Sequence, residues 1–438
     1  MRPHLVLVRP PQPLAVDLGP FALGVLAASV RDVVSVSILD AAALPLDRAA
    51  LEVWARRPSL VGVSIMDIAG LGPGAQFIQR LLATGPATSS GRAPVIAGGH
   101  GVTCLPDHVL AMGADAVVLG EGEQVLRRIV LAGLVPGEAG LAMSVGGRIV
   151  TGPQPPPIMP LDRLPSPARD LMPPSPLGIH TIETSRGCPH GCAFCETTRF
   201  HGRLWRPKSP LRVADEVRSL VEEHGAWVIL IADDNFCASP ARVQRICAEL
   251  QAGELPAMFI VSARADDLLR DPDLLPAMAE ARMLRVQVGI ETLDGETAAA
   301  IGKPIGPEVY EEAFRRMRAL GIFSVASLIV GLPGEPLKAR AQAVERCAAV
   351  LPDTAVFLAL QPMPGTPVVE NGCLAPRPGD IADAARFTQA YWEHPRVRRN
   401  LARAARGSGV RALLAQAALR EPPHRQSPLA LVPSGGTG

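Results

Sequence analysis

The chain has 438 residues, of which 48% are hydrophobic, and its 43 basic and 42 acidic side chains leave a formal net charge of +1. A chain of this length is expected to form about two to three domains with sizeable cores. The near balance of charge gives no sign of a nucleic-acid or membrane surface. The longest apolar stretches, Ala226–Ala232 and Phe323–Val330, are too short to cross a bilayer and are predicted to be buried strands.

The first 133 residues alternate short β-rich runs with helical segments. Five strands are predicted at His4–Arg9, Val33–Leu39, Leu60–Ile65, Pro94–Ala97 and Ala116–Leu119. Amphipathic stretches lie between them at Phe21–Arg31, Asp47–Arg56 and Gly74–Ala83. Because the strands are apolar throughout and joined by helices, the pattern predicts an α/β domain with a doubly wound, flavodoxin-like parallel sheet.

In a doubly wound domain the ligand site lies beyond the carboxyl ends of the strands, so the loops there are the candidate binding residues. They include Ser64, the run Gly98-Gly-His-Gly101 and the run Gly120-Glu-Gly-Glu123. Glycines in such loops let the backbone approach a bulky ligand closely. The run Gly70-Leu-Gly-Pro-Gly-Ala75 is only partly similar to a dinucleotide fingerprint, because it lies in the third unit and contains proline.

Across about 130 residues this region resembles the cobalamin-binding domain that precedes many radical S-adenosylmethionine (SAM) barrels. The resemblance lies in Pro20-Phe-Ala-Leu-Gly-Val-Leu-Ala, Ile38-Leu-Asp, Leu60-Val-Gly-Val-Ser, Ala97-Gly-Gly-His and Leu119-Gly-Glu-Gly-Glu123. It implies that Ser64, Gly98, Gly99 and His100 contact cobalamin.

The Asp-x-His-x-x-Gly string that places a histidine under cobalt in other cobalamin proteins is absent from the sequence, and neither His100 nor His108 has that context. This departure resembles the radical SAM branch, in which cobalamin has no histidine ligand. Two alternatives stay open: the domain keeps the fold without binding a corrin, and His100 is a loop hydrogen-bonding residue.

Residues 136–177 are predicted to be a stiff linker between residues 1–135 and the second half. Gly146-Gly-Arg suggests a small hairpin, and residues 152–178 hold ten prolines in 27 positions. So many prolines exclude helix and central strand. Leu161-Asp-Arg-Leu-Pro-Ser-Pro-Ala-Arg-Asp-Leu171 also resembles the connector of cobalamin-dependent radical SAM proteins.

Three cysteines, Cys188, Cys192 and Cys195, lie in the run Arg186-Gly-Cys-Pro-His-Gly-Cys-Ala-Phe-Cys195. A C-x-x-x-C-x-φ-C run, with an aromatic residue (here Phe194) at φ, supplies three thiolates to a 4Fe–4S cluster and leaves one iron open for a small molecule. The run resembles the signature of radical SAM enzymes. That family binds SAM at the open iron and cleaves it to a 5′-deoxyadenosyl radical.

Zinc and disulfides are the alternatives for these thiols. A structural zinc site needs a fourth ligand, for which His190 or His201 would serve, but the chain has no second C-x-x-C pair. The other cysteines, Cys104, Cys237, Cys247, Cys347 and Cys373, are scattered in apolar or helical contexts. No signal peptide precedes them, so we expect a cytoplasmic protein with reduced thiols.

The strand–helix rhythm resumes over residues 178–375. Strands are predicted at His180–Thr184, Trp227–Ala232, Met258–Ala263, Arg285–Ile290, Ser324–Val330 and Ala355–Leu360. Helices are predicted to begin at Ser209-Pro210 and Ser239-Pro240, where a capping serine precedes proline. Six units favour a partial (β/α)6 barrel, in which chemistry gathers where strands end.

The strand ends supply a candidate SAM pocket that includes Asp233, Ser262, Arg264 and Glu291. Carboxylates there accept hydrogen bonds from ribose or ammonium groups, and Arg264 suits a carboxylate. These strings, with Lys303 and Pro362-Met-Pro-Gly-Thr-Pro367, resemble radical SAM positions, and Glu291 matches the one that contacts SAM. The alternative for Asp233 and its neighbour is ordinary loop or helix capping.

Residues 376–420 are predicted to be helical, at Asp383–Trp392, Val397–Arg406 and Val410–Leu419, and to cap the open side of the barrel. Residues 421–438 are rich in proline, glycine and serine and are predicted to be disordered.

The resemblance implies a radical SAM enzyme with a 4Fe–4S cluster, SAM and cobalamin as cofactors. It favours methylation of an unactivated carbon in a small biosynthetic intermediate, with an electron donor such as flavodoxin or ferredoxin. A cobalamin-dependent cyclase or oxidative rearrangement enzyme shares every motif, as does a radical SAM enzyme with an empty first domain. A cluster-bearing electron-transfer module is a further alternative, against which the SAM-pocket strings argue. The sequence assigns no catalytic side chain.

Overall fold

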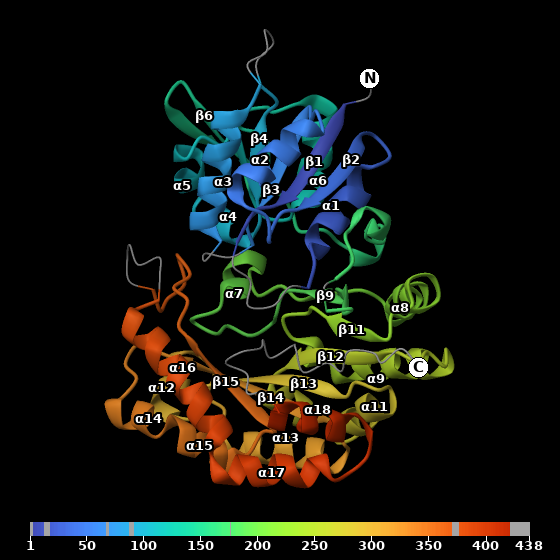
Figure 1. The fold of residues 1–438 in the computed structure, drawn as a ribbon, viewed down its shortest axis with the longest axis vertical. Helices are drawn as coiled ribbons and strands as arrows, with labels where there is room; N and C mark the ends of the chain where they lie inside the picture. The colour runs from blue at the N-terminus through green and yellow to red at the C-terminus, as the bar shows by residue number, and fades with distance from the viewer. Residues whose placement is uncertain are drawn as a thin grey trace. The chain divides into compact units, whose positions relative to one another are not determined.

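The computed structural model describes residues 3–12, 18–66, 70–86, 92–175, 177–369 and 376–420. The chain divides into two compact units, residues 1–174 with 363–365 and residues 175–362 with 366–438 (Figure 1). No helix in the described ranges combines the length and the apolar character that a membrane span requires. Cys373 and the predicted disordered tail lie outside these ranges.

The first unit is built on one sheet of seven strands in the order β2-β1-β3-β4-β5-β6-β7. Its strands are β1 (His4–Arg9), β2 (Ser35–Asp40), β3 (Leu60–Ser64), β4 (Val95–Gly98), β5 (Ala116–Val118), β6 (Leu141–Val145) and β7 (Arg148–Thr151). The first five are parallel. The order 2-1-3-4-5 is that of flavodoxin-like sheets and confirms the predicted fold class.

Helices cover both faces of this sheet. Its helices are α1 (Phe21–Val30), α2 (Leu46–Ala55), α3 (Leu71–Thr84), α4 (His100–Cys104), α5 (Pro106–Ala111) and α6 (Gly122–Ala132). Successive residues of β1 point to opposite faces: Val6 and Val8 pack with α2 and α3, whereas Leu5 and Leu7 pack with α1 and α6. Each face therefore has its own apolar core, which explains strands without polar alternation.

The hairpin predicted around Gly146 is confirmed, but placing residues 136–151 in a linker was wrong. Strand β6 pairs antiparallel with β5 and with β7, so these residues extend the first sheet. The physical reason is that β5 would otherwise be an open edge with unpaired backbone groups. In the described residues of the proline-rich stretch that follows, the regular structure is two 3-10 turns, at Leu161–Arg163 and Arg169–Leu171. The other domain boundaries stay predictions.

The second unit contains six parallel strands in the order β15-β14-β13-β12-β11-β8, which confirms the partial barrel. They are β8 (His180–Ile182), β11 (Val228–Ile231), β12 (Met258–Ala263), β13 (Arg285–Glu291), β14 (Phe323–Val330) and β15 (Thr354–Ala359). A short antiparallel ribbon, β9 (Ser185–Arg186) with β10 (Arg206–Pro207), adjoins the end of β8.

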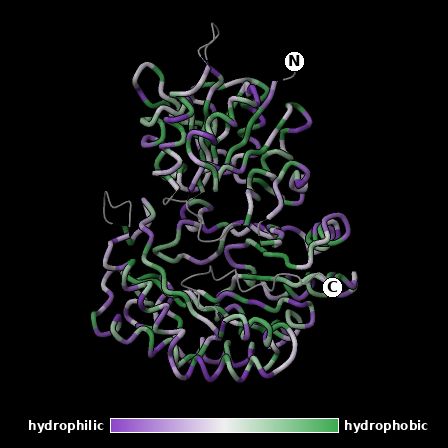
Figure 2. Tube along the Cα trace, viewed as in Figure 1, coloured by the Kyte–Doolittle hydropathy of each residue, from purple (hydrophilic) through white to green (hydrophobic). Residues whose placement is uncertain are grey.

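The helices of this unit that precede its C-terminal region are α7 (Glu196–His201), α8 (Pro210–His224), α9 (Pro240–Ala252), α10 (Ala265–Leu269), α11 (Leu274–Glu280), α12 (Gly295–Ala300), α13 (Pro307–Ala319), α14 (Leu337–Ala341) and α15 (Ala343–Val350). Neighbouring helices pack on one another: α8 on α9, α9 on α11, and α13 on α15. Ser209 caps α8 by accepting a 3.3 Å hydrogen bond from Arg212 N, whereas Ser239 makes no capping bond at α9. Figure 2 shows the strands largely in the hydrophobic colour and the helices in both colours.

The C-terminal helices are α16 (Pro378–Glu393), α17 (Pro395–Ala405) and α18 (Gly409–Arg420). Helix α16 packs along the edge strand β15, where Tyr391 donates to Pro352 O at 2.8 Å. Buried Asp353, at the amino end of β15, accepts bonds from Asn400 of α17 and Arg411 of α18 at 3.1 and 2.6 Å. The expectation that all three helices cap the open side was therefore wrong, because α17 and α18 attach to the amino ends of the strands.

Candidate functional site

The three cysteines lie in the loop that follows β8 and β9 and ends where α7 begins at Glu196. All three thiols are half-buried. Burial raises the pKa of the Cys188 thiol to about 11; a backbone hydrogen bond from His190 opposes the rise, and the charges of Cys195, Asp234 and Cys192 add to it. Without a metal ion the Cys188 thiol is therefore held protonated at neutral pH.

Both ends of the cysteine loop are joined to one carboxylate, that of Asp234 just after β11. Its Oδ2 accepts from the backbone N–H of Gly187 at 3.1 Å, and its Oδ1 accepts from Thr197 Oγ1 at 2.7 Å. Gly187 precedes the first cysteine and Thr197 follows the last one. Asp234 therefore closes the loop from the neighbouring strand end.

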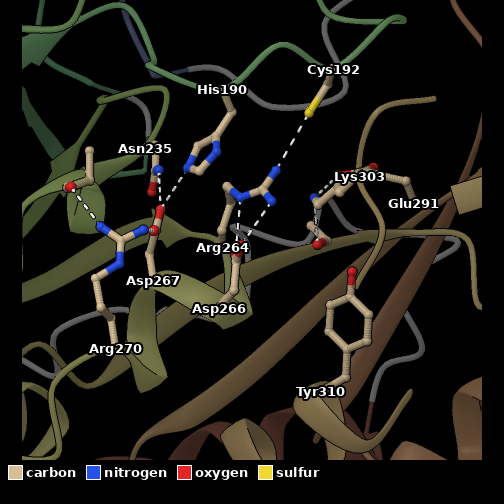
Figure 3. Close-up of polar contacts among 12 residues, drawn as sticks. His190, Cys192, Asn235, Arg264, Asp266, Asp267, Arg270, Glu291, Lys303 and Tyr310 are labelled. Atoms are coloured by element: carbon tan, nitrogen blue, oxygen red, sulfur yellow. Dashed lines mark hydrogen bonds and ion pairs between the residues drawn. The ribbon is translucent and has the colours of Figure 1, made fainter. Parts of the chain in front are cut away.

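The middle of the loop is held by two further contacts. His190 Nε2 donates to Asp267 Oδ2 at 3.0 Å (Figure 3). The N–H of Ala193 donates to Ile301 O at 2.8 Å. Asp267 is fully buried and also accepts from Asn235 Nδ2 at 2.6 Å and from Arg270. Burial pushes the pKa of Asp267 up, but the hydrogen bonds from His190 and Asn235 outweigh it, so the net pKa is lowered. An ionised Asp267 thus orients His190.

The donor set fits an iron–sulfur cluster. Three thiols are presented from one loop, and soft thiolates are the ligands such clusters use. Within the described ranges, no three His, Cys, Asp or Glu side chains are arranged around a single metal-ion position. A cubane takes one thiolate at each of three separate irons, so its ligands need not converge on one point.

Glu291 lies at the end of β13, beside the cysteine loop, in a strained backbone conformation. Its φ is +65°, in the left-handed region that disfavours a side chain, and the pairing of β13 with β14 shifts register between Gly289 and Glu291. Such strain is concentrated at functional sites. Lys303 Nζ fixes the carboxylate by donating to Glu291 Oε1 and Gly289 O, both at 2.8 Å. A Cβ on Gly289 would lie 2.3 Å from Glu291 Oε1, so this arrangement requires glycine.

Arg264 follows β12 and reaches the cysteine loop. Its Nε and Nη2 donate to the two carboxylate oxygens of Asp266 at 3.0 and 2.9 Å, and its Nη1 lies 3.5 Å from Cys192 Sγ (Figure 3). Burial raises the pKa of Cys192, whereas the charges of Lys303 and Arg264 oppose that rise. The predicted SAM-pocket residues Glu291 and Arg264 thus lie around one cysteine.

The remaining predicted residues of this site have other surroundings. Asp233 is buried, and its carboxylate accepts from Thr184 N, Thr184 Oγ1 and Ser185 Oγ at 2.7, 2.5 and 2.6 Å. These hydrogen bonds agree with the alternative interpretation of Asp233, in which its carboxylate caps a loop. Ser262 is half-buried near the end of β12, and Phe194 is half-buried within the cysteine loop. Cofactor contacts for all three stay predictions.

Sequence reasoning missed the contacts that hold the loop. The acidic run that begins at Asp233 was noticed, but nothing distinguished Asp234 as the residue that joins the loop ends. Asp267 was not singled out. The available signal was its place in Arg264-Ala-Asp-Asp267, an acidic pair directly after a buried strand. His190 was considered only as a zinc ligand.

In the first unit the predicted cobalamin residues gather at the carboxyl ends of β3 and β4. Ser64 pairs with Gly98 in the last register position, and His100 begins α4. Gly99 has a φ of +124°, and a Cβ there would lie 2.2 Å from Ile65 O, so only glycine fits. Thr103 Oγ1 donates to Gly99 O at 2.9 Å. The loop is thus preformed at the ligand edge of a doubly wound sheet. Contact of these residues with cobalamin stays a prediction.

Residues 182–347 match the radical SAM superfamily, and residues 13–130 match the B12 binding domain. An uncharacterized methyltransferase of Pyrococcus horikoshii is 28% identical over 383 residues, which cover 83% of this chain and 81% of that relative. The anaerobic magnesium-protoporphyrin IX monomethyl ester cyclase of Rubrivivax gelatinosus is 27% identical over 326 residues, 70% of this chain but only 57% of the cyclase.

The fold resembles that of the radical SAM methyltransferase TsrM from Kitasatospora setae, solved with cobalamin and a 4Fe–4S cluster bound. The TM-score is 0.71 at 21% identity, over 84% of this chain and 74% of that chain. The chain therefore contains a B12-binding domain followed by a radical SAM domain. The cofactors that these two domains imply are a 4Fe–4S cluster, SAM and cobalamin.

Proposed function

We propose that this enzyme is a cobalamin-dependent radical SAM methyltransferase that methylates an unactivated carbon of a small molecule. The observation that carries the proposal is the cysteine loop, fixed at the carboxyl ends of the barrel strands beside Glu291, in a chain that also has a B12-binding domain. The Pyrococcus relative, which is named a methyltransferase and covers most of the chain, supports it.

Each group of residues has a distinct task in this proposal. Cys188, Cys192 and Cys195 hold the cluster, and Glu291, fixed by Lys303, receives hydrogen bonds from the SAM nucleoside or its ammonium group. Bound together, the cluster, SAM and cobalamin supply an electron for SAM cleavage, a hydrogen-abstracting radical and a transferable methyl group. The chain supplies position, because correct placement of the reactants lowers the activation barrier, by about 7–11 kcal/mol in favourable cases.

A cobalamin-dependent cyclase or oxidative enzyme is the second candidate. The cyclase of Rubrivivax gelatinosus aligns with 70% of this chain. An enzyme of similar sequence is therefore named for cyclisation rather than for methylation. The electron donor in either case is proposed to be a flavodoxin or ferredoxin, and the compartment a reducing cytosol in which the thiols stay free to bind iron.

Product stoichiometry separates the two candidates. Methylation requires two SAM molecules per turnover, one for the radical and one to restore the methyl group on cobalt. We therefore expect 5′-deoxyadenosine and S-adenosylhomocysteine in a one-to-one ratio with methylated product. Both are quantified by mass spectrometry with SAM that carries a deuterated methyl group. Product without deuterium, together with deoxyadenosine alone, would establish the cyclase or oxidative reaction instead.

Cobalamin is expected to bind without a histidine on cobalt. The sequence lacks the Asp-x-His-x-x-Gly string, and His100 is the first residue of α4, next to the preformed glycine turn. Wild type should bind hydroxocobalamin, and His100→Ala should leave the spectrum of the bound cobalamin unchanged, because no imidazole lies on cobalt. The cob(II) form should show no nitrogen hyperfine splitting from imidazole in electron paramagnetic resonance. Such splitting would contradict the prediction, and absence of binding would support an empty first domain.

A further inference from the structure

One arginine makes a side-chain contact to a cluster cysteine. Arg264 has only 11% of its side chain exposed, and Nη1 lies 3.5 Å from Cys192 Sγ. Within the described part of the chain, Cys188 and Cys195 receive no side-chain hydrogen bond at sulfur. Cys192 is therefore electrostatically distinct from the other two cysteines.

The orientation of this guanidinium is fixed by a carboxylate on its other edge. Asp266 accepts from Nε and Nη2 in the two-pronged geometry that makes arginine–carboxylate pairs directional. Because the fork is planar and rigid, that pairing leaves Nη1 to face the sulfur. Burial lowers the pKa of Arg264, but the hydrogen bond and charge of Asp266 outweigh it and the net pKa is raised, so the group stays a cation.

Lys303 is a second cation near Cys192, but its ammonium group donates its hydrogen bonds to other acceptors. Lys303 lowers the pKa of Cys192 through its charge, yet its ammonium donates to Gly289 O and Glu291 Oε1. Glu291 also partly cancels its charge, since the carboxylate raises the pKa of Cys192. Arg264 is consequently the residue whose loss changes the hydrogen bonding of the thiolate itself.

We propose that Arg264 is a positioning residue for the cluster: it donates a hydrogen bond to the Cys192 thiolate and makes the cluster easier to reduce, with Asp266 holding it in place. Reduction adds one negative charge, and a cationic donor on a ligand sulfur stabilises the reduced form more than the oxidised form. Hydrogen bonds to sulfur and local charge are established determinants of cluster potential. The inference rests on the proposed cluster, but it assigns Arg264 a role that precedes SAM binding.

The test is the midpoint potential of the cluster in full-length, anaerobically reconstituted protein without SAM, followed by electron paramagnetic resonance during reductive titration. Arg264→Gln should shift the midpoint to more negative values at unchanged iron content. Asp266→Asn, which keeps the arginine but releases its orientation, should shift it in the same direction by less. Arg340→Gln is the matched control, because Arg340 is also largely buried and paired with carboxylates, those of Asp380 and Asp383, and is not hydrogen-bonded to Cys188, Cys192 or Cys195.

The possible results distinguish three roles for Arg264: tuning of the cluster potential, binding of SAM, and structural support of the loop. Equal potentials in wild type and Arg264→Gln would overturn the proposal, and weaker SAM binding in that variant would then place Arg264 on the SAM carboxylate. If both site variants lose iron while Arg340→Gln retains it, Arg264 is structural and the tuning role is wrong. Failure of wild type to take up iron would instead refute the proposed function.

Discussion

Replacement of any one of Cys188, Cys192 or Cys195 with alanine will remove most of the iron from the reconstituted protein and abolish SAM cleavage. Two thiolates cannot hold a cubane firmly, and even the loss of a supporting group around a metal typically costs on the order of 10- to 100-fold in affinity. We therefore expect a loss of at least about 100-fold in deoxyadenosine formation. Iron and sulfide assays, with the charge-transfer absorption of the cluster, measure the first effect directly.

The control uses cysteines that are buried in the barrel wall. Cys237 and Cys347 are completely buried, and Cys237 Sγ lies 3.9 Å from Met278 Sδ within the core. Their alanine variants should lose about 1 kcal/mol of stability through the small cavity created, and keep full iron content. Stoichiometric zinc in wild type, together with failed iron reconstitution, would refute the cluster and with it the enzyme class.

Strands buried on both faces were predictable because their signal is local. Met258–Ala263 was expected as a strand and is β12 with the same bounds, and the expected strand at His4–Arg9 is β1. A run of apolar, β-branched residues bounded by turn signals has few other stable arrangements. The six-strand barrel followed from counting such runs.

Features that depend on distant partners were not predictable. The hairpin of β6 and β7 was recognised, but its attachment to β5 depends on which sheet edge is open. Helices α17 and α18 were recognised as helices, yet their place is decided by Asp353, which bonds residues 47 and 58 positions further along the chain. An amphipathic pattern predicts that a helix packs against the protein with its apolar face, but it does not predict which surface that face contacts.

In the site, too, some residues could be predicted from a local pattern, whereas others depend on partners distant in the sequence. The ligand cysteines are read from a ten-residue run, because their spacing within one loop carries the chemistry. The residues that shape this loop come from the ends of other strands: Asp234 after β11, Arg264 and Asp267 after β12, and Lys303 after α12. Their types were visible in the sequence, whereas their partners required the barrel to bring the strand ends together.

Asp234→Ala is expected to reduce iron retention by about 10- to 100-fold without unfolding the barrel. The substitution removes both hydrogen bonds that join Gly187 and Thr197, so the loop that presents the three thiols loses its closure. Each hydrogen bond to a charged acceptor contributes about 1.5–3 kcal/mol, and here that free energy holds the ligands in place rather than stabilising the core. Iron release to a chelator, followed over time in anaerobic protein, measures the effect.

Two further variants distinguish loop closure from general destabilisation. Asp234→Asn keeps an oxygen that can accept one of the two bonds, so its iron retention should lie between those of wild type and the alanine variant. Asp353→Ala removes another aspartate that anchors backbone, Ser324 N at 3.0 Å, and distant side chains, but at the amino ends of the strands. It should lower the midpoint of thermal unfolding while its folded fraction keeps iron as wild type does. Equal chelator release from Asp234→Ala and Asp353→Ala would show that Asp234 acts only through global stability.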